Sequence, residues 1–372
     1  MENEQNKNYL KIWFKRLLIY FPIVSLIIYT LLGTKILWFH ASLSILLTIT
    51  PLLFIATLLY YLAFLLIKRS KKYLVFFIFI LFITLIKYAD SIISFNPSAP
   101  NNTTKISVMT WNLERLGELR NKKQVSQNIN TTINEIQQNN PEVIILQEVT
   151  HKQLKSIITG LKITNASYEW SDYYGTMKNY KSGIAVLINS NSAWRIKNKN
   201  VIKLPPQWKS IYVELENNKK QHINVLGLHI APPKITSSDI KTIGKTIVKT
   251  PKKGLRKFRD KIRTYSRQLS LQTNQIKKVL SIINNFNDPT IIAGDFNSSS
   301  ELPLHVQLRN KMSDAWLESG NGFGSTRYFG EVIPLRIDYI YSTNEFISTF
   351  ATVPPAHFSD HNPVFANFHL LK

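Results

Sequence analysis

The sequence predicts an α/β domain, and three features of the chain indicate it. Eight short runs rich in Val, Ile and aromatic residues lie between residues 105 and 370, and two segments of helical periodicity lie among them. Strands interleaved with helices are typical of layered α/β folds. The hydrophobic content of 44% supplies a core and excludes a chain that is disordered throughout.

The first 95 residues of the 372 differ from the rest because they contain three apolar blocks. A membrane helix needs roughly 20 apolar residues. We therefore expect transmembrane helices at about 17–34, 41–67 and 73–94, with Lys87 and Asp90 near the interface in the third. A cleaved signal peptide would have one apolar region of about 7–15 residues, which does not fit three blocks.

Basic residues flank these blocks unevenly, and this pattern predicts a topology. Four Lys or Arg precede the first block, one separates it from the second, and four separate the second from the third. The positive-inside rule then places the N-terminus in the cytoplasm and everything after Phe95 outside it. We expect a multi-pass protein of the bacterial inner membrane, and the absence of Cys suits an extracytoplasmic domain without disulfides.

A linker rich in Pro, Asn, Ser and Thr covers residues 96–104, and the predicted soluble domain spans 105–372. We expect helices at 123–139 and 264–285. The expected strands cover residues 105–113, 142–149, 182–189, 210–216, 223–230, 290–296, 336–342 and 363–370.

One segment of this domain is strongly basic. Lys234–Arg267 holds twelve Lys or Arg and two acids, in a chain whose net charge is +23. This charge fits a solvated helix face or a patch for polyanions, and both interpretations stay open. Phe258 and Tyr265 are fewer aromatics than a base-stacking platform favours. The predicted substrate-binding residues are Lys252, Lys253, Arg256, Lys257 and Arg259.

Several polar residues end or interrupt the apolar runs. Each alone fits a turn or a cap, but they recur at strand ends, where α/β sheets gather ligand-binding groups. We therefore expect one site to contain Asn112, Glu148, His229, Asp295, Asn297, Asp338, Asp360 and His361.

Their residue types suit hydrolysis of a phosphodiester, which needs charge neutralisation and an activated water. Because the chain has no Cys and only 8 His, a hard cation with oxygen ligands, Mg²⁺ or Mn²⁺, is the expected cofactor.

The order of "GDFN", "RIDY" and "SDH" makes residues 105–372 resemble the endonuclease/exonuclease/phosphatase family, the deoxyribonuclease-I-like hydrolases of phosphate esters. The resemblance implies a four-layered sandwich, in which two mixed β-sheets are flanked by helices and the site lies at one end. It also implies that Glu148 is the first metal ligand, with Asn112, Asp360 and Glu114 nearby.

The remaining predicted roles concern water and phosphate. Asp295 would orient or deprotonate the attacking water, while Asn297 and His229 would contact the phosphate. His361 would pair with Asp338, which fixes its tautomer. Nuclease members support the equivalent of His229 with a carboxylate, whereas this chain offers Ser182 at the matching position.

The expected function is a membrane-anchored, metal-dependent phosphoesterase that acts outside the cytoplasm and is most like an endonuclease. A phospholipid or sphingomyelin-type phosphodiesterase or phosphatase is an alternative, since a lipid bilayer is an expected partner. A non-catalytic membrane receptor is another. Such a receptor would be expected to lack Glu148, Asp295 or His361, and all three are present.

Overall fold

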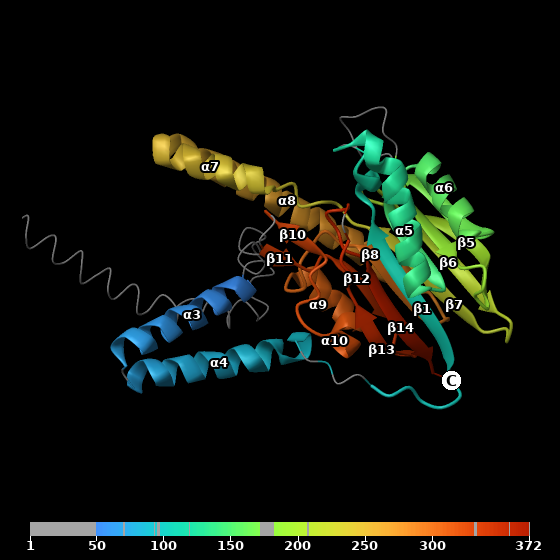
Figure 1. The fold of residues 1–372 in the computed structure, drawn as a ribbon, viewed down its shortest axis with the longest axis horizontal. Coiled ribbons are helices and arrows are strands. Elements are labelled where there is room, and N and C mark those ends of the chain that lie inside the picture. The colour runs from blue at the N-terminus through green and yellow to red at the C-terminus, as the bar shows by residue number, and fades with distance from the viewer. Residues whose placement is uncertain are drawn as a thin grey trace, which may run out of the picture. The chain divides into compact units, whose positions relative to one another are not determined.

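The chain divides into two compact units, Met1–Ala89 and Asp90–Lys372 (Figure 1). The computed structural model describes residues 50–69, 71–92, 94, 97–118, 120–171, 182–206, 208–330, 333–356 and 358–371.

The described part of the N-terminal region consists of two helices, α3 (Thr50–Lys68) and α4 (Lys71–Ile92). Among the described residues, no helix is both long enough and apolar enough to cross a membrane. The uncharged stretch of α4 runs only from Tyr73 to Ile86, which is shorter than the roughly 20 residues of a span. The predicted spans at 41–67 and 73–94 are therefore not supported, while residues 17–34 and 41–49 lie outside the described residues.

Two six-stranded sheets make up most of the second unit (Figure 1). The first has the order β13 (Phe346–Thr352), β14 (Val364–Leu370), β1 (Thr104–Asn112), β2 (Val143–Val149), β4 (Ser182–Ile188), β3 (Asn165–Ser171). The second has the order β5 (Trp194–Leu204), β6 (Trp208–Asn217), β7 (His222–His229), β8 (Thr290–Asp295), β12 (Asp338–Ser342), β9 (Ser313–Asp314).

Both sheets are mixed, because β1 pairs in parallel with β2 and β7 with β8, while the other pairs are antiparallel. A separate hairpin joins β10 (Arg327–Phe329) to β11 (Ile333–Leu335). The predicted α/β fold, with two mixed sheets flanked by helices, is confirmed.

The main core lies between the sheets. Alternate residues of a strand point to opposite faces. In the first sheet, Val108, Ile145 and Val186 accordingly face inward and meet residues of the second sheet such as Val213 and Ile291. This pairing of two apolar faces buries both sheets and fixes their relative position.

Helices cover the outer face of the first sheet. α5 (Val125–Asn139) and α6 (His151–Leu161) contribute Ile136 and Ile157 to a second core cluster, which also includes Trp111 and Leu146 from the sheet. α6 begins at a capping box in which Thr150 and Gln153 satisfy each other's backbone N–H groups. Two short 3₁₀ turns, η2 (Glu114–Gly117) and η3 (Lys122–Gln124), lie between β1 and α5.

The remaining helices follow β7 and β8 in the chain. α7 (Ser237–Lys249) leads into α8 (Pro251–Ile283), which has 33 residues and starts well before the predicted helix at 264–285. The Gln272 and Gln275 side chains of α8 hydrogen-bond to Ala231, which comes just after β7, so this half of α8 is attached to the second sheet. The short helices α9 (Pro303–Arg309) and α10 (Ala315–Ser319) follow β8.

Candidate active site

Strand register in the second sheet brings three of the predicted site residues side by side. β8 lies between β7 and β12, and Asp295 pairs with His229 on one side and with Asp338 on the other. Residues directly opposite each other in neighbouring strands have their side chains on the same face, within about 5.5 Å. An imidazole and two carboxylates therefore share one end of this sheet.

The first sheet supplies the groups that face them. A bulge follows Gln147 in β2, and Glu148 takes a left-handed backbone conformation there, with φ 52°. Asn112, at the end of β1, donates from Nδ2 to Asp295 Oδ2 at 2.9 Å and to Glu148 Oε1 at 3.2 Å. Its Oδ1 accepts the backbone N–H of Glu114 at 3.0 Å. Asn112 thus connects the two sheets and presents its nitrogen, rather than its oxygen, to the carboxylates.

The loop after β8 fixes the Asp295 carboxylate. The backbone N–H of Asn297 donates to Asp295 Oδ1 at 2.7 Å, and Asn297 Nδ2 donates to Oδ2 at 3.1 Å and to Ile230 O at 2.9 Å. Gly294 allows β7 to approach closely, because a Cβ there would lie 1.9 Å from Leu228 O. Both side-chain N–H groups of Asn297 are thus engaged within the protein, and its contact with phosphate stays a prediction.

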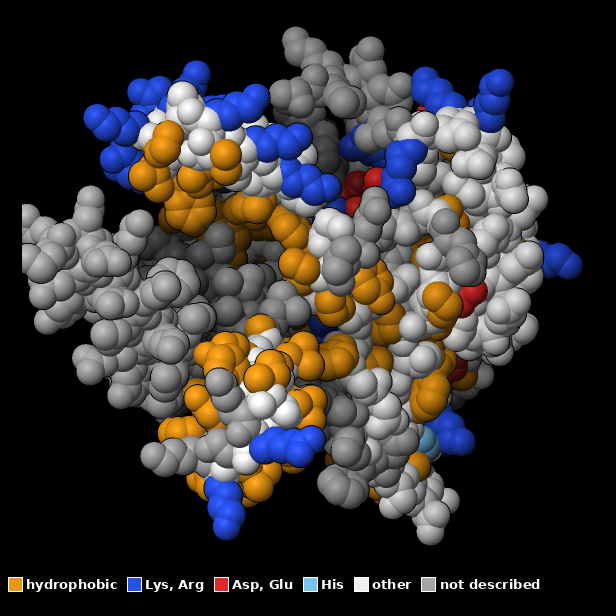
Figure 2. Space-filling model, turned by 60° about the vertical axis from the view of Figure 1, so that its left-hand side comes forward, with side chains coloured by type: hydrophobic (Ala, Val, Ile, Leu, Met, Phe, Trp, Pro, Cys, Tyr) orange, Lys and Arg blue, Asp and Glu red, His pale blue; other side chains and the backbone are white. Residues whose placement is uncertain are grey.

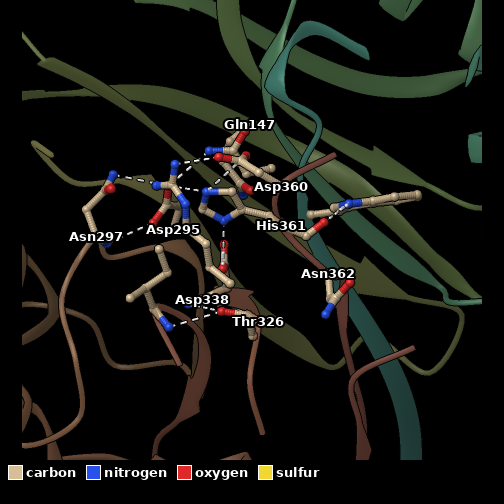
Figure 3. Close-up of polar contacts among 12 residues, drawn as sticks. Gln147, Asp295, Asn297, Thr326, Asp338, Asp360, His361 and Asn362 are labelled. Atoms are coloured by element: carbon tan, nitrogen blue, oxygen red, sulfur yellow. Dashed lines mark hydrogen bonds and ion pairs between the residues drawn. The ribbon is translucent and has the colours of Figure 1, made fainter. Parts of the chain in front are cut away.

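His361 is held between the two buried acids (Figure 3). Its Nδ1 lies 2.9 Å from Asp338 Oδ2, and its Nε2 lies 3.9 Å from Asp295 Oδ2. Trp111 Nε1 donates to the carbonyl oxygen of His361 at 3.0 Å, and Ser359 Oγ accepts its backbone N–H at 3.1 Å. These contacts bring together the predicted His361–Asp338 pair and orient Nε2 toward Asp295.

Burial and neighbouring charges shift the pKa values of these groups. Burial, followed by the charge of Asp338, raises the pKa of Asp295 and makes this carboxylate a stronger base. Burial alone would lower the pKa of His361, but the charges of Asp338 and Asp295 outweigh it and raise the pKa to about 9. His361 is therefore an imidazolium at neutral pH, with Nδ1 donating to Asp338.

His229 faces the same carboxylates from the other side. Its Nε2 lies 3.7 Å from Asp295 Oδ2 and 3.8 Å from Glu148 Oε1. Trp208 packs edge-on against the imidazole, with 5.0 Å between the ring centroids. Within the described residues, no other carboxylate lies within 4.0 Å of this imidazole. Ser182, which the sequence analysis matched to a carboxylate of nuclease members, is buried at the start of β4.

Arg327 belongs to this site although the sequence analysis missed it. It forms an isolated backbone bridge with His361, and its guanidinium donates to Asp360 Oδ2. The charges of Asp360 and Asp295 oppose the effect of burial and raise its pKa, so Arg327 is charged. Glu114 lies close by and pairs with Arg120. Arg327 comes from the short strand β10, where no apolar run indicated a strand end.

The acidic residues present two candidate positions for a cation. Among the described residues, one group of ligand atoms lies within 4.8 Å of one another, from Asp295, Asp338 and His361, and this group could hold a metal ion. Asp338 Oδ1 is buried there without a hydrogen-bond partner. The predicted set is instead centred on Glu148, whose carboxylate is partly exposed. Oxygen donors in both sets suit Mg²⁺ or Mn²⁺.

The five predicted substrate-binding residues lie elsewhere. They occupy the exposed N-terminal half of α8, whereas Gln272 of the same helix donates to Asn297 O at 3.0 Å beside the site. A helix rises 1.5 Å per residue, so residues 252–259 lie roughly 20–30 Å along the axis from Gln272. Their role in substrate binding stays a prediction.

Comparison with solved structures shows the fold. The chain is similar to an endonuclease/exonuclease/phosphatase from Bacteroides vulgatus, with 13% identity, a TM-score of 0.54, and coverage of 72% of this chain and 99% of that one. It is also similar to the human Nocturnin catalytic domain with bound sulfate, with 18% identity, a TM-score of 0.51 and coverage of 73% and 96%. A third similar structure is a humanised TDP2 from D. rerio, with 14% identity, a TM-score of 0.51, and coverage of 71% of this chain and 98% of that one.

A search of curated protein sequences finds no significant match. The family model described as "Endonuclease/Exonuclease/phosphatase family" matches residues 109–361, which include every site residue from Asn112 to His361. Because this match covers more than half of the chain, the chain belongs to the Endonuclease/Exonuclease/phosphatase family.

Proposed function

We propose that the protein is a divalent-metal-dependent phosphodiester hydrolase whose action is most like that of an endonuclease. Family membership supports hydrolysis of phosphoester bonds. The observation that carries the proposal is the position of Asp295, a buried carboxylate of raised pKa that two imidazole Nε2 atoms approach to 3.7 and 3.9 Å. A base surrounded by cationic and hydrogen-bonding groups suits attack on an anionic ester.

In the proposed reaction, Asp295 accepts a proton from the attacking water as the new bond from oxygen to phosphorus forms. The imidazolium of His361, oriented by Asp338, stabilises the charge on the phosphoryl oxygens, and Arg327 adds a second cation beside it. The bond to the leaving oxygen then breaks, and that oxygen takes up a proton from solvent. Asn112 and Asn297 keep Asp295 in position by donating to its carboxylate.

We place the cation at Glu148, with Asp360 and Asn112 beside it as the sequence predicts. The alternative group includes Asp338 and His361, which are already joined to each other through Oδ2 and Nδ1 at 2.9 Å. A bound Mg²⁺ or Mn²⁺ would polarise a phosphoryl oxygen and lower the pKa of a coordinated water. Calorimetric Mn²⁺ binding tests this placement, since Glu148→Gln should abolish binding and Asp338→Asn should largely retain it.

The substrate class is tested by side-by-side hydrolysis of DNA, RNA, phosphatidylcholine and sphingomyelin. We expect cleavage of nucleic acid with Mg²⁺, no cleavage with EDTA, and loss of activity in Asp295→Asn. Faster cleavage of a phospholipid would favour the lipid-directed alternative. If the wild-type chain hydrolyses none of these esters, the proposal is wrong and the non-catalytic receptor becomes the better hypothesis.

The cellular location is a separate proposal, namely that the catalytic unit acts outside the cytoplasm and is held near a membrane. Its support is the flanking charge pattern and the twelve large hydrophobic side chains that α3 and α4 expose. A single crossing at 17–34 and three crossings both place the C-terminus outside the cytoplasm, so a reporter fused after Lys372 should be active only outside. A reporter fused after Arg69 should be active outside if the chain crosses once and inside if it crosses three times.

A further inference from the structure

α7 and residues 251–263 of α8 form an antiparallel helical pair, which we name the basic hairpin. The two helices pack closely at Gly254, where a Cβ would lie 2.5 Å from the backbone nitrogen of Ile247. Lys261 Nζ lies 2.8 Å from Asp239 Oδ2, and Asp239 also completes the capping box of α7 with Thr236. The hairpin is therefore a defined structure rather than an extended basic tail.

The basic hairpin exposes hydrophobic side chains along one face. Ile240 and Val248 of α7 are 42% and 84% exposed, and Leu255 and Phe258 of α8 are 59% and 44% exposed. Residues spaced by three, four or eight positions share one side of a helix. In the described part of the second unit, these four account for half of the exposed large hydrophobic residues. Figure 2 shows hydrophobic side chains at the upper left with Lys and Arg around them.

Basic side chains flank this apolar face. The segment Lys234–Arg267 contains twelve Lys or Arg, and both of its acids already have basic partners, at 2.8 Å for Asp239 with Lys261 and 3.9 Å for Asp260 with Arg263. Helices that lie in the surface of a membrane combine these two features, because the apolar face enters the lipid while the cations meet anionic headgroups.

We propose that the basic hairpin docks onto an anionic lipid bilayer. The exposed face favours this partner over nucleic acid, because aliphatic side chains such as Val248 and Leu255 gain nothing from bases, whereas lipid buries them. Tyr265 is 4% exposed and cannot stack on a base, which leaves Phe258 as the exposed aromatic of the segment. A single ring is a weak platform for single-stranded nucleic acid.

The position of the hairpin suits docking rather than catalysis. Its five basic residues at 252–259 lie roughly 20–30 Å along α8 from Gln272, which donates to Asn297 O in the loop after β8. They therefore hold the enzyme at a surface without touching the ester that is cleaved. This inference does not depend on the phosphodiesterase proposal, since binding can be measured without any turnover.

The absence of Cys from the chain makes a direct test possible. The full chain with Val248→Cys, labelled with an environment-sensitive dye, is reconstituted in phosphatidylcholine vesicles with or without phosphatidylglycerol. We expect a blue shift and at least about a twofold fall in iodide quenching only on the anionic vesicles, and high salt should reverse both. A label at the exposed turn residue Asn191, introduced as Asn191→Cys, should respond to neither lipid.

Two further variants separate charge from apolar contact. Replacing Lys252, Lys253, Arg256, Lys257 and Arg259 with Gln should abolish the response, and Leu255→Ser with Phe258→Ser should weaken it. Lys277→Gln with Lys278→Gln is the matched control, because both lysines are exposed on the other half of α8. The proposal would be overturned if the label at Val248→Cys stayed open to iodide on anionic vesicles. Equal protection from iodide on neutral vesicles, or stronger protection by a DNA duplex, would overturn it as well.

Discussion

The two halves of α8 form one continuous helix but differ in burial, composition and contacts. The C-terminal half buries Leu269, Ile276 and Val279, and its Gln272 donates to the loop after β8. The N-terminal half exposes most of its side chains and is rich in Lys and Arg. Packing determines which residues the buried half can hold. The exposed half packs against α7 through Gly254 and Lys261, and the basic side chains that it leaves exposed point to a partner outside the chain.

The largest effect should come from the carboxylate that the buried half helps to position. Asp295→Asn keeps the hydrogen-bonding shape but removes the base, so we expect at least roughly a hundredfold fall in kcat on any phosphodiester. His361→Ala should have an effect of similar size. Steady-state kinetics with a model diester, with circular dichroism as the check on folding, would measure it. Near-normal turnover in Asp295→Asn would remove this residue from the chemistry.

Arg327 should have the next largest effect, because its charge faces Asp360 beside the site. Arg327→Gln should lower kcat/KM about tenfold or more, the scale of losing one cation from the phosphoryl environment. Arg327→Lys should recover part of the loss by restoring the charge. If Gln and Lys variants behave alike, the arginine acts through its shape rather than its charge.

A pair of substitutions within α8 compares its halves directly. Gln272→Leu leaves the carbonyl oxygens of Ala231 and Asn297 without their donor, which should cost about 1–3 kcal/mol of unfolding free energy and lower kcat several-fold. Arg256→Gln, in the exposed half, should change neither quantity. Urea unfolding and kinetics on both variants supply the comparison. Equal effects would mean that the two halves do not differ in function.

The smallest effect concerns pH and a buried histidine of α9. His305 Nδ1 lies 2.8 Å from the Tyr341 hydroxyl, and its Nε2 lies 2.9 Å from Ser298 Oγ. Burial, aided by the charges of Arg309 and Arg336, lowers the pKa of His305 well below the usual value. The unfolded chain, in which a histidine titrates near 6.5, then binds more protons below that pH. The contribution of His305 to the free energy of unfolding is therefore fully present above about pH 6.5. Below that pH it falls by up to about 1.4 kcal/mol per pH unit.

The difference between two chains isolates this residue from other titrating groups. The gap in unfolding free energy between the wild type and His305→Gln should be constant above pH 6.5 and should shrink as the pH falls toward 5. Urea melts followed by tryptophan fluorescence measure the gap. A gap that does not vary with pH would show that His305 titrates alike in the folded and unfolded chains.

The fold was predictable from the sequence mainly where strands are interior. All eight predicted strands are interior members of their sheets, whereas the strands at the four edges, β13, β3, β5 and β9, were missed. An interior strand whose two faces are both covered consists mainly of apolar residues and is therefore visible in the sequence as an apolar run. The edge strand β5 has exposed basic residues at alternate positions, Arg195, Lys197 and Lys199, so it lacks such a run.

The site divides in the same way. Asp295, Asp338 and His229 end interior strands, so recognising those strands indicated that their side chains would meet. Arg327 lies on a short strand outside both large sheets, and its approach to Asp360 depends on a tertiary contact that no local pattern encodes. The exposed face of the basic hairpin was also not predictable, because it depends on how α7 packs against α8.

Asn112 has a consequence for how the enzyme matures. It comes from one sheet and donates to Asp295 in the other, and Glu148 and His229 likewise come from different sheets. A chain in which only one sheet has folded contains an incomplete set of reacting groups. If the proposed function is right, hydrolytic activity therefore requires the two sheets to dock, and a partly folded copy is inactive.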